Sequence, residues 1–359
     1  VKAARYLRAE GSAGAAASAA VQPGWVPSAH TDPAAPKSLS TPTPPAPGSA
    51  RCAFVSTNSI VQGEQVGVLW SWMLAQGVRI QFAHRTFSWS NEAKGNAAVH
   101  CVIVGFALHA PTAPVRVFDY AQDITGDGVE SSASRLNPYL VEGPDLLIDK
   151  RRKPLQASVP EVVFGSMPND GGHLLLSEDE AAQIRATDAI AARYIRSFLG
   201  ADEFINNIPR YCLWLVDATS ADKAASPELK RRLADVRKMR EASPKKPTQA
   251  LAATPHLFGE IRQTDQPYIL IPRHSSENRY FIPIGFLNSD VVCGDANSMI
   301  PNATHYHFGM LSSTMHNAWM RTVAGRLESR YRYSNTIVYN NYPWPQAPTD
   351  KQRQAIETA

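Results

Sequence analysis

Long apolar stretches are missing from this sequence of 359 residues. No run approaches the ~20 consecutive apolar residues that a membrane-spanning helix needs, so we expect no membrane span. Cysteine is sparse, with only Cys52, Cys101, Cys212 and Cys293. Their spacing suits neither a metal knuckle nor a disulfide framework, and predicts small buried thiols in a reducing compartment. The histidines His305 and His307 have no acidic or cysteine partner at ligand spacing, so we expect no metal site.

A large charge imbalance is also absent, because 36 Lys and Arg face 32 Asp and Glu. The resulting net charge of +4 says little about nucleic acid. Residues 223–246 are an exception, with nine basic residues against three acidic ones. Two interpretations stay open for this block: a solvated helix face, or a row of phosphate contacts.

Composition divides the chain into segments. With 44% hydrophobic residues the chain is able to bury two cores, and we expect two globular units. Residues 1–9 have a helical pattern, whereas 10–50 are rich in Ala, Pro, Ser and Gly. We predict that 10–50 is a disordered low-complexity insertion, with a docked functional loop as the alternative. Since the chain begins and ends within helical patterns, we expect a fragment of a longer protein.

Residues 51–137 have the pattern of an open α/β sheet. Apolar strands are predicted at 52–57, 78–87 and 98–108, and an amphipathic helix at 58–77. A strand, a crossover helix, a second strand and a hairpin form a typical edge of such a sheet.

From residue 138 the pattern becomes mixed α+β. Helices are predicted at 177–185, at 188–199 behind an Asp188 cap, and at 227–241. Short strands are predicted at 210–218, 268–273, 280–287 and 290–296. A last helix starts at Ser312 and Ser313 and carries an apolar stripe that continues to Leu327, so we expect it to end at Glu328–Arg330.

Several long stretches resemble one family, the MmeI-like DNA modification enzymes. They are "AFVSTNSIVQGEQVG" (53–67), "FAHRTFSWSNEAKGNAAVHCVIVGF" (82–106), "NPYLVEGPD" (137–145), "FLGADEFINNIPRYCLWL" (198–215), "LIPRHSSENR" (270–279) and "STMHNAWMRTVAGRLESRYRYSNTIVYNNYPWP" (313–345). The resemblance covers nearly everything outside 10–50, in the family's order. It implies an adenine-N6 DNA methyltransferase fused to a target recognition domain, often with a nuclease upstream.

The resemblance also implies a fold, a cofactor and a partner. Residues 1–9 would end a methyltransferase helix, and 51–137 would form the C-terminal edge of a Rossmann-like class I sheet. Residues 138–345 would be the α+β target recognition domain, and 346–359 the start of a C-terminal helical segment. The parent protein would use S-adenosyl-L-methionine, act on double-stranded DNA in a restriction-modification system, and be cytoplasmic in a bacterial-type cell.

The family's catalytic motifs are missing from this sequence. Neither the glycine loop for S-adenosyl-L-methionine nor the Asn-Pro-Pro-aromatic tetrapeptide is present, and "NPYL" has Tyr139 where the second proline belongs. We therefore expect no catalytic residue here, and no methyl transfer by this chain alone. At the end of the first strand, Ser56, Thr57 and Asn58 would face the cofactor side, although a cap by Asn58 or Ser59 on the next helix is the alternative.

The family places an aromatic side chain against the target base in the loop between the last two strands. Phe87 falls at the matching position, with Trp89 as a second candidate. An aromatic ring can replace part of the stacking that a flipped base loses. The alternative is that both rings belong to the core.

A second group of candidates lies near the C-terminus. In this family an acid and a base at the positions of Glu328 and Arg330 read one base pair. A carboxylate accepts from cytosine N4, and arginine donates to guanine O6 and N7. Four further arginines are expected on the DNA backbone: Arg273, Arg279, Arg326 and Arg332. The alternative is a solvated ion pair worth ~0–1 kcal/mol.

Two other functions stay open. The chain could be a stand-alone DNA-binding specificity module without catalytic activity, or an unrelated α/β protein whose basic patches are incidental.

Overall fold

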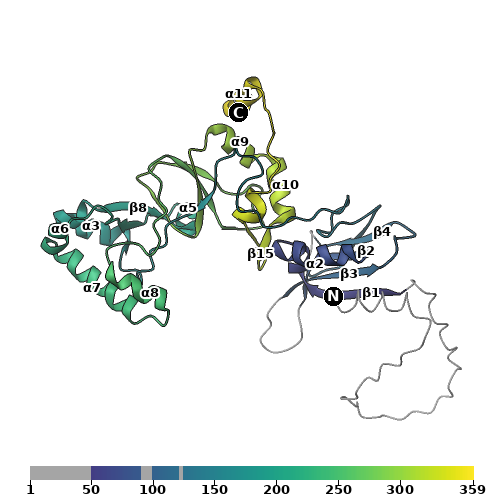
Figure 1. The fold of residues 1–359 in the computed structure, drawn as a ribbon, viewed down its shortest axis with the longest axis horizontal. Coiled ribbons are helices and arrows are strands. Elements are labelled where there is room, and N and C mark those ends of the chain that lie inside the picture. The colour runs from purple at the N-terminus through teal and green to yellow at the C-terminus, as the bar shows by residue number, and fades with distance from the viewer. Residues whose placement is uncertain (1–49, 90–98, 121–123) are drawn as a thin grey trace, which may run out of the picture. The chain divides into compact units, whose positions relative to one another are not determined.

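The computed structural model describes residues 50–89, 99–120 and 124–359 (Figure 1). The predicted helix at 1–9, nearly all of the predicted insertion at 10–50 and most of the polar loop after Trp89 lie outside these ranges. The described chain forms two compact units. The first holds the described residues up to Val61 with Gln65–Leu147, and the second holds Gln62–Glu64 with Ile148–Ala359.

The first unit is built on a five-stranded sheet with the order β1-β3-β2-β4-β5. Its strands are β1 (Arg51–Thr57), β2 (Arg79–Trp89), β3 (Val99–Ala107), β4 (Val115–Asp119) and β5 (Val129–Ala133). β3 is antiparallel to both of its neighbours, β1 and β2. The predicted strands at 52–57, 78–87 and 98–108 are confirmed, and β4 and β5 extend the sheet.

The predicted helix at 58–77 is broken into two parts. A 3-10 turn, η1 (Asn58–Val61), is followed by Gln62 and Gly63 before α2 (Glu64–Ala75) begins. Gly63 has φ +61°, which interrupts the helical backbone and favours glycine. A Cβ atom at Gly63 would lie 2.9 Å from the Cα of Gly325. The backbone N–H of Gly63 donates to the Val323 carbonyl at 3.1 Å. Close backbone packing at Gly63 therefore explains the break.

The division between the units falls at Leu147, ten residues beyond the boundary expected from the sequence. Residues 134–145 are held to the first unit by hydrogen bonds: Ser134 donates to Glu142, and Arg85 donates twice to the Leu140 carbonyl. The assignment of functional domains to 51–137 and 138–345 stays a prediction.

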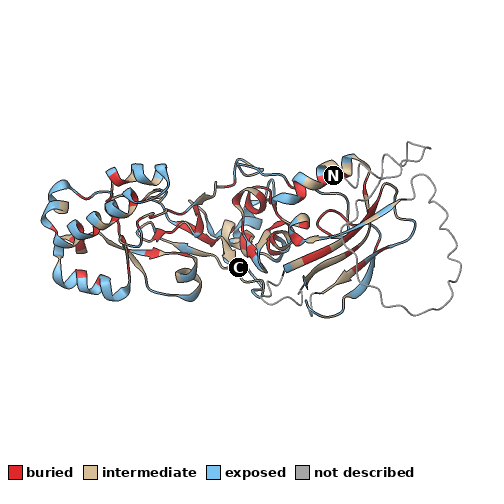
Figure 2. Ribbon diagram, turned by 90° about the horizontal axis from the view of Figure 1, so that it is seen from below, coloured by how far each residue is buried: buried red, intermediate tan, exposed pale blue. Residues whose placement is uncertain are grey.

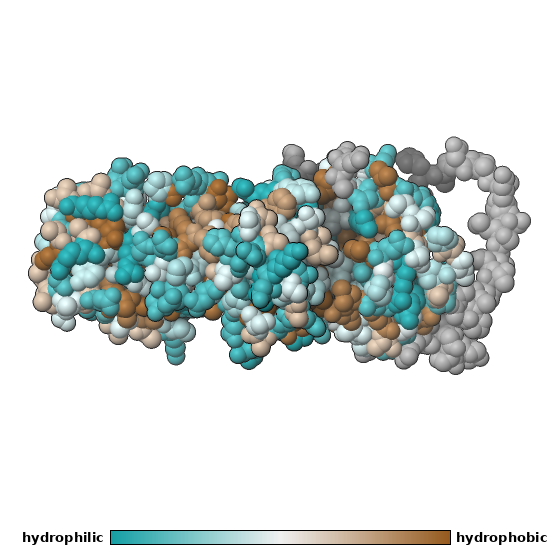
Figure 3. All heavy atoms as spheres, turned by 90° about the horizontal axis from the view of Figure 1, so that it is seen from above, coloured by the Kyte–Doolittle hydropathy of each residue, from teal (hydrophilic) through white to brown (hydrophobic). Residues whose placement is uncertain are grey.

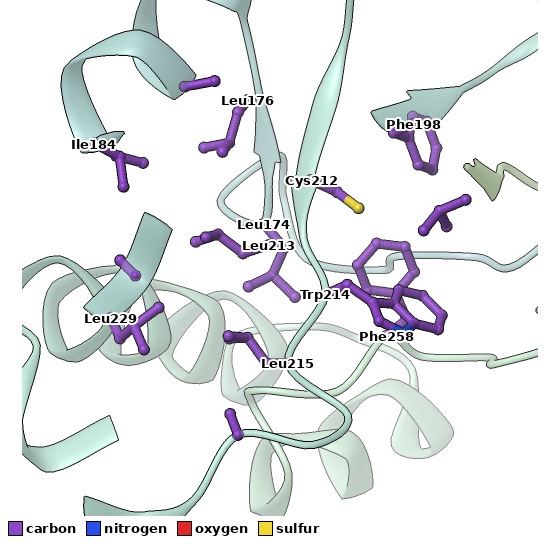
Figure 4. Packing of buried hydrophobic residues seen from close by; sticks show 14 of the residues in the cluster. Leu174, Leu176, Ile184, Phe198, Cys212, Leu213, Trp214, Leu215, Leu229 and Phe258 are labelled. Atoms are coloured by element: carbon purple, nitrogen blue, oxygen red, sulfur yellow. The ribbon is translucent and has the colours of Figure 1, made fainter. Parts of the chain in front are cut away.

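The second unit begins with a sheet of order β13-β8-β9-β7. Its strands are β7 (Leu175–Leu176), β8 (Ile195–Leu199), β9 (Tyr211–Leu213) and β13 (Val292–Cys293). The neighbouring helices are α3 (Glu178–Thr187), α4 (Ala189–Ala192), α5 (Ala201–Asn206), α6 (Ser220–Ala225), α7 (Pro227–Glu241) and α8 (Lys246–Ala250), followed by η2 (Leu251–Ala253). Between them lies an apolar core that includes Leu213, Trp214 and Phe258 (Figure 4).

The prediction of a helix at 188–199 is wrong for its second half, which forms a strand. Asp188 does cap α4 through the Ile190 and Ala191 amides, but α4 stops at Ala192. The chain then enters β8, which pairs with β9 on one side and β13 on the other. A central position in the sheet therefore overrides the local helical pattern.

The basic helix α7 has the predicted bounds. Its apolar stripe is confirmed, since Leu229 and Val236 are fully buried. Two of its arginines are buried as well: Arg232 joins Glu228 and Glu180, and Arg240 donates to the carbonyls of Pro168, Asn169, Leu251, Thr254 and Leu257. These two guanidinium groups are therefore structural, so neither a solvated face nor phosphate contact describes them.

The rest of the second unit contains two more sheets, of order β12-β10-β14-β6 and β11-β16-β15. Their strands are β6 (Val163–Phe164), β10 (Tyr268–Pro272), β11 (His274–Ser275), β12 (Gly285–Leu287), β14 (Asn297–Pro301), β15 (Gly325–Leu327) and β16 (Arg330–Arg332). The helices are α9 (His305–Ser312), α10 (Thr314–Val323), the π-helix η3 (Asn335–Tyr339) and α11 (Asp350–Thr358). Only Arg273 separates β10 from β11, so one extended segment serves both sheets.

The aromatic residues of "YRYSNTIVYNNYPWP" mostly form a core. Tyr333, Tyr339, Tyr342 and Trp344 are buried, and so is His316. Figure 2 shows how buried and exposed residues are distributed over the ribbon. His316 Nδ1 donates to the Leu311 carbonyl at 3.0 Å, and its Nε2 lies 3.1 Å from the Tyr333 hydroxyl. Burial lowers the pKa of His316 to about 4. The hairpin β15–β16 immediately precedes the three tyrosines and Trp344 of this core in the chain.

Three of the four cysteines are buried free thiols, as predicted. Across the residues described, no helix has the length and hydrophobicity needed to span a membrane. Figure 3 shows hydrophilic residues spread over the visible face, interrupted by smaller hydrophobic areas.

Candidate nucleic-acid interface

Glu328 and Arg330 lie in a β-hairpin, so the prediction that they end a helix is wrong. α10 stops at Val323, with Ala324 already extended. β15 and β16 then pair antiparallel, with Leu327 opposite Arg330. Glu328 and Ser329 are the two turn residues, and Glu328 has the left-handed φ of +58° that such turns require. The four-residue spacing of apolar side chains continues in the sequence from Val323 to Leu327, but the helical backbone ends at Val323.

The two side chains are exposed at the tip of this hairpin. Exposed fractions are 73% for the Glu328 side chain and 49% for the Arg330 side chain. Arg330 Nη2 donates to Glu328 Oε2 at 2.8 Å. An ion pair this exposed contributes only ~0–1 kcal/mol, so both groups are able to exchange it for other partners at little cost. A carboxylate acceptor and a guanidinium donor are thus presented side by side.

The sheet β11-β16-β15 has one outward and one inward face. In antiparallel pairs, directly opposite residues share a face. His274 lies opposite Arg332, and Arg332 lies opposite Gly325. Arg330 is two residues from Arg332 on the same strand, so it shares their face. On the other face, Tyr331 and Ser275 are buried.

The outward face is strongly cationic. The pKa of His274 is lowered first by burial, then by the charges of Arg273, Arg332 and Arg330. These three guanidinium groups therefore lie close enough to act on one imidazole. Such a concentration of positive charge is typical of a surface that binds phosphate groups.

The four arginines expected on a nucleic-acid backbone differ in their partners. Arg332 and Arg279 are exposed, and neither side chain forms a hydrogen bond or ion pair with the residues that the structure describes. Arg326 lies over the Tyr331 ring, 4.1 Å from its centroid, and donates to the Ser329 carbonyl. Arg273 lies over the Phe164 ring at 4.7 Å and donates to the Asp295 carbonyl. Each of the last two still has donors left, because a guanidinium carries five N–H groups.

Phe87 and Trp89 belong to the end of β2, whereas the sequence placed them in a loop. They lie opposite Cys101 and Val99 of β3. The Trp89 side chain is 49% exposed, and Phe87 is half-buried with its ring 5.2 Å from that of Tyr120. Neither ring is part of the buried core. The positions 90–98 that follow lie outside the described residues.

The polar residues at the end of β1 are held by local contacts. Thr57 Oγ1 and Ser59 Oγ lie 2.8 Å apart and bond to each other, and Asn58 is buried as the first residue of η1. Asn58 and Ser59 lie within η1, ahead of Gly63, so neither caps α2. That Ser56, Thr57 and Asn58 face the cofactor side stays a prediction. Among the residues that can be described, no cluster of three or more His, Cys, Asp or Glu could hold a metal ion.

In the sequence, His274 is one of several Arg, His and Ser donors in the polar run 273–279 that suit phosphate or base contacts, and nothing singles it out from the others. Its place beside Arg332 depends on pairing between strands that are far apart in the chain. The only signal in the sequence is the polar run around it, "RHSSENR".

Comparisons with known proteins identify the family. A family model described as the MmeI target recognition domain matches residues 142–346, and one for the MmeI DNA-methyltransferase domain matches 45–119. DNA methyltransferase A of Bacillus subtilis is 39% identical over 314 residues, which cover 86% of this chain and 34% of that protein.

A solved structure of the type IIL restriction-modification enzyme MmeI in complex with DNA is also similar. It is 48% identical, with a TM-score of 0.80, over 87% of this chain and 41% of that one. The chain therefore spans between about a third and two fifths of the length of these relatives. The chain belongs to the MmeI family, with a match to its target recognition domain preceded by a match to part of its methyltransferase domain.

Proposed function

We propose that this chain is part of a site-specific DNA adenine-N6 methyltransferase of a restriction-modification system. Residues 138–345 would supply target recognition, and 51–137 would supply the C-terminal edge of the catalytic sheet and part of the target-base pocket. The family matches and the cationic hairpin surface both support this assignment. The parent protein would take its methyl group from S-adenosyl-L-methionine, which supplies an activated methyl group when bound.

The observation that carries the proposal is the exposed pair Glu328 and Arg330 on a two-residue turn. Glu328 would accept a hydrogen bond from cytosine N4, and Arg330 would donate two to guanine O6 and N7 of the same base pair. Each correct contact is worth ~1–3 kcal/mol of discrimination. The pair would separate on binding, at little cost in the free protein.

The neighbouring arginines would set the register of the hairpin. Arg332 and Arg279, which have no partner among the described residues, would each bind a backbone phosphate. Arg273 and Arg326 are already fixed by aromatic rings and carbonyls, so their remaining donors would point in fixed directions. Preorganised donors bind with less loss of side-chain freedom.

Phe87 and Trp89 would stack on the flipped target base. Both rings lie at one end of β2, and Trp89 is half-exposed. A ring available at the surface can take the place of a base's lost stacking neighbour. This role is inferred from the family together with the exposure of the two rings.

The edge strand β1 supports the idea that catalytic elements lie elsewhere in the parent. Phe54 and Val55 of β1 are 45% and 54% exposed, and β1 pairs on one side only among the described strands. Unpaired apolar edges are usually covered in native proteins. We expect the isolated chain to transfer no methyl group, which an assay with labelled S-adenosyl-L-methionine on duplex DNA checks directly.

Salt-dependent binding to duplex DNA tests the recognition role. Affinity should fall steeply with added salt, because each neutralised phosphate releases counterions. Arg332→Gln should reduce the slope of log affinity against log salt by about one. Arg353→Gln changes an exposed arginine on α11, outside residues 138–345; it is the matched control and should leave the slope unchanged. Salt-independent binding, or equal slopes for both variants, would contradict the proposal.

A further inference from the structure

His274 occupies a defined place on the cationic face of the hairpin sheet. It is the first residue of β11 and lies directly opposite Arg332 of β16. On the far side of Arg332 lies Gly325, which has no side chain. This row across three strands therefore carries one imidazole and one guanidinium. At its third position, a Cβ on Gly325 would lie 3.7 Å from the Cα of Gly63, so the backbone at Gly63 packs against the β15 end of the row.

The charged groups around His274 are almost all positive. Arg330 and Arg332 face it from β16, the strand packed against β11, and Arg273 precedes it in the chain. Glu328 is the acidic residue of the hairpin turn, and it already accepts a hydrogen bond from Arg330. Glu277, in the loop that follows β11, has contacts of its own. An anion placed here would thus meet the Arg332 guanidinium and a ring able to carry a further proton, with the charges of Arg330 and Arg273 nearby.

We infer that His274 is a further DNA-contacting residue, whose protonated ring donates a hydrogen bond to a backbone phosphate beside the base pair read by Glu328 and Arg330. This inference rests on the proposed function and extends it. A phosphate offers oxygens at hydrogen-bond distance and a charge that offsets the repulsion from the three arginines. Arg332 would bind the same phosphate or its neighbour, since the two side chains share one face.

The consequence is that DNA binding takes up a proton. In the free protein the pKa of His274 lies below its ordinary value, so the ring is neutral at pH 7. A bound phosphate raises that pKa by favouring the charged form. Affinity for DNA should therefore rise as pH falls through the pKa of the bound state, and level off below the pKa of the free state. The gain is at most about tenfold per pH unit for one proton.

The test is the affinity of the full chain for a random-sequence duplex between pH 8 and pH 5.5 at fixed salt. Wild type should bind several-fold more tightly at the acidic end. His274→Gln, which cannot be protonated, should lose that dependence and bind like wild type at pH 8. His274→Lys, charged throughout, should bind tightly across the range. His305→Gln removes an exposed histidine of α9 and should keep the wild-type pH dependence.

Each contrary result has a distinct meaning. If His274→Gln keeps the wild-type pH dependence and unfolds at the same temperature as wild type, the inference is wrong while the proposed function stands. His274→Gln could instead lose the pH dependence of binding only on a duplex that carries the parent's methylated site, and keep it on random sequence. In that case His274 contacts a base edge, and the phosphate assignment is wrong. If wild type binds no duplex at any pH, the proposed function itself fails.

Discussion

Arg240 is the clearest case in which a basic residue serves the fold instead of a ligand. It is fully buried and donates five hydrogen bonds to backbone carbonyls, from Pro168 to Leu257. Burial lowers its pKa, because the charged form loses its hydration. The carbonyls of the loop around η2 have this guanidinium as their shared partner, so the loop depends on it.

Arg240→Ala should lower the free energy of unfolding by about 3 kcal/mol or more. The carbonyls of Asn169 and Leu257 would lose their donor, the other three would keep only a backbone N–H, and a cavity would open. Arg237→Ala, on the exposed side of the same helix, should change it by no more than ~0.5 kcal/mol. Urea unfolding of both variants measures the difference. Equal effects would mean that the loop is held by other contacts.

His316 makes the stability of the second unit depend on pH. The pKa of His316 is about 4 in the fold, against an ordinary value of 6.5. As the pH falls, His316 therefore takes up a proton at a higher pH in the unfolded chain than in the folded one. Stability is fully present above pH 6.5 and falls as pH drops from 6.5 toward 4, by about 3 kcal/mol in total.

Chemical unfolding at pH 7.5 and at pH 4.5 tests this coupling. His316→Gln should be less stable at pH 7.5, since it disturbs the contacts with Leu311 and Tyr333, but its stability should change less between the two pH values. An identical loss in wild type and variant would assign the acid sensitivity to other groups.

At the scale of elements, Gly63 shows how a single backbone position anchors the hairpin. It combines φ +61° with a 2.9 Å approach of its missing Cβ to Gly325, the first residue of β15. Gly172 has a similar φ of +87° but open space around it. Comparing substitutions at the two glycines therefore distinguishes the cost of backbone strain from the cost of steric overlap.

Gly172→Ala should cost about 1 kcal/mol of stability from backbone strain alone, whereas Gly63→Ala should cost about 3 kcal/mol, because overlap with β15 adds to that strain. Thermal unfolding of the two variants gives the comparison. Similar costs for both would show that the loop at Gly63 moves away from β15 freely.

Elements with strong local signals could be predicted from the sequence. α7 has a Ser226 cap, Pro227 in its first turn and a continuous apolar stripe, and its bounds agree with the prediction. β8 was missed because Ile195 and Phe198 also fit a helical spacing, and only pairing with β9 and β13 decides for a strand. Prediction from the local sequence pattern therefore fails where pairing with distant strands determines the secondary structure.

The same limit applies to the candidate site. Glu328 and Arg330 were found through resemblance to a family, but their place in a hairpin was not, since the apolar spacing of α10 continues past its end. His274 was recognised only as one donor in the polar run 273–279, because its neighbour Arg332 is brought to it by β11–β16 pairing. Residue chemistry was readable in the sequence, while the grouping of residues on one face required the structure.

At the scale of the whole molecule, the chain joins a match to part of a methyltransferase domain with a match to a target recognition domain. Within the second unit, a π-helix and a buried aromatic cluster follow the hairpin directly. A buried core next to an exposed turn in the chain suits a reading element, because base discrimination requires side chains that are held in register.

The most direct measurement is the recognition site of the full-length parent carrying Glu328→Lys together with Arg330→Asp, read by methylation-sensitive sequencing of DNA from cells that express it. We predict that the preferred base pair changes at one position of the site, because donor and acceptor have been exchanged, and that all other positions are retained. An unchanged site, or a loss of methylation at every sequence alike, would contradict the account.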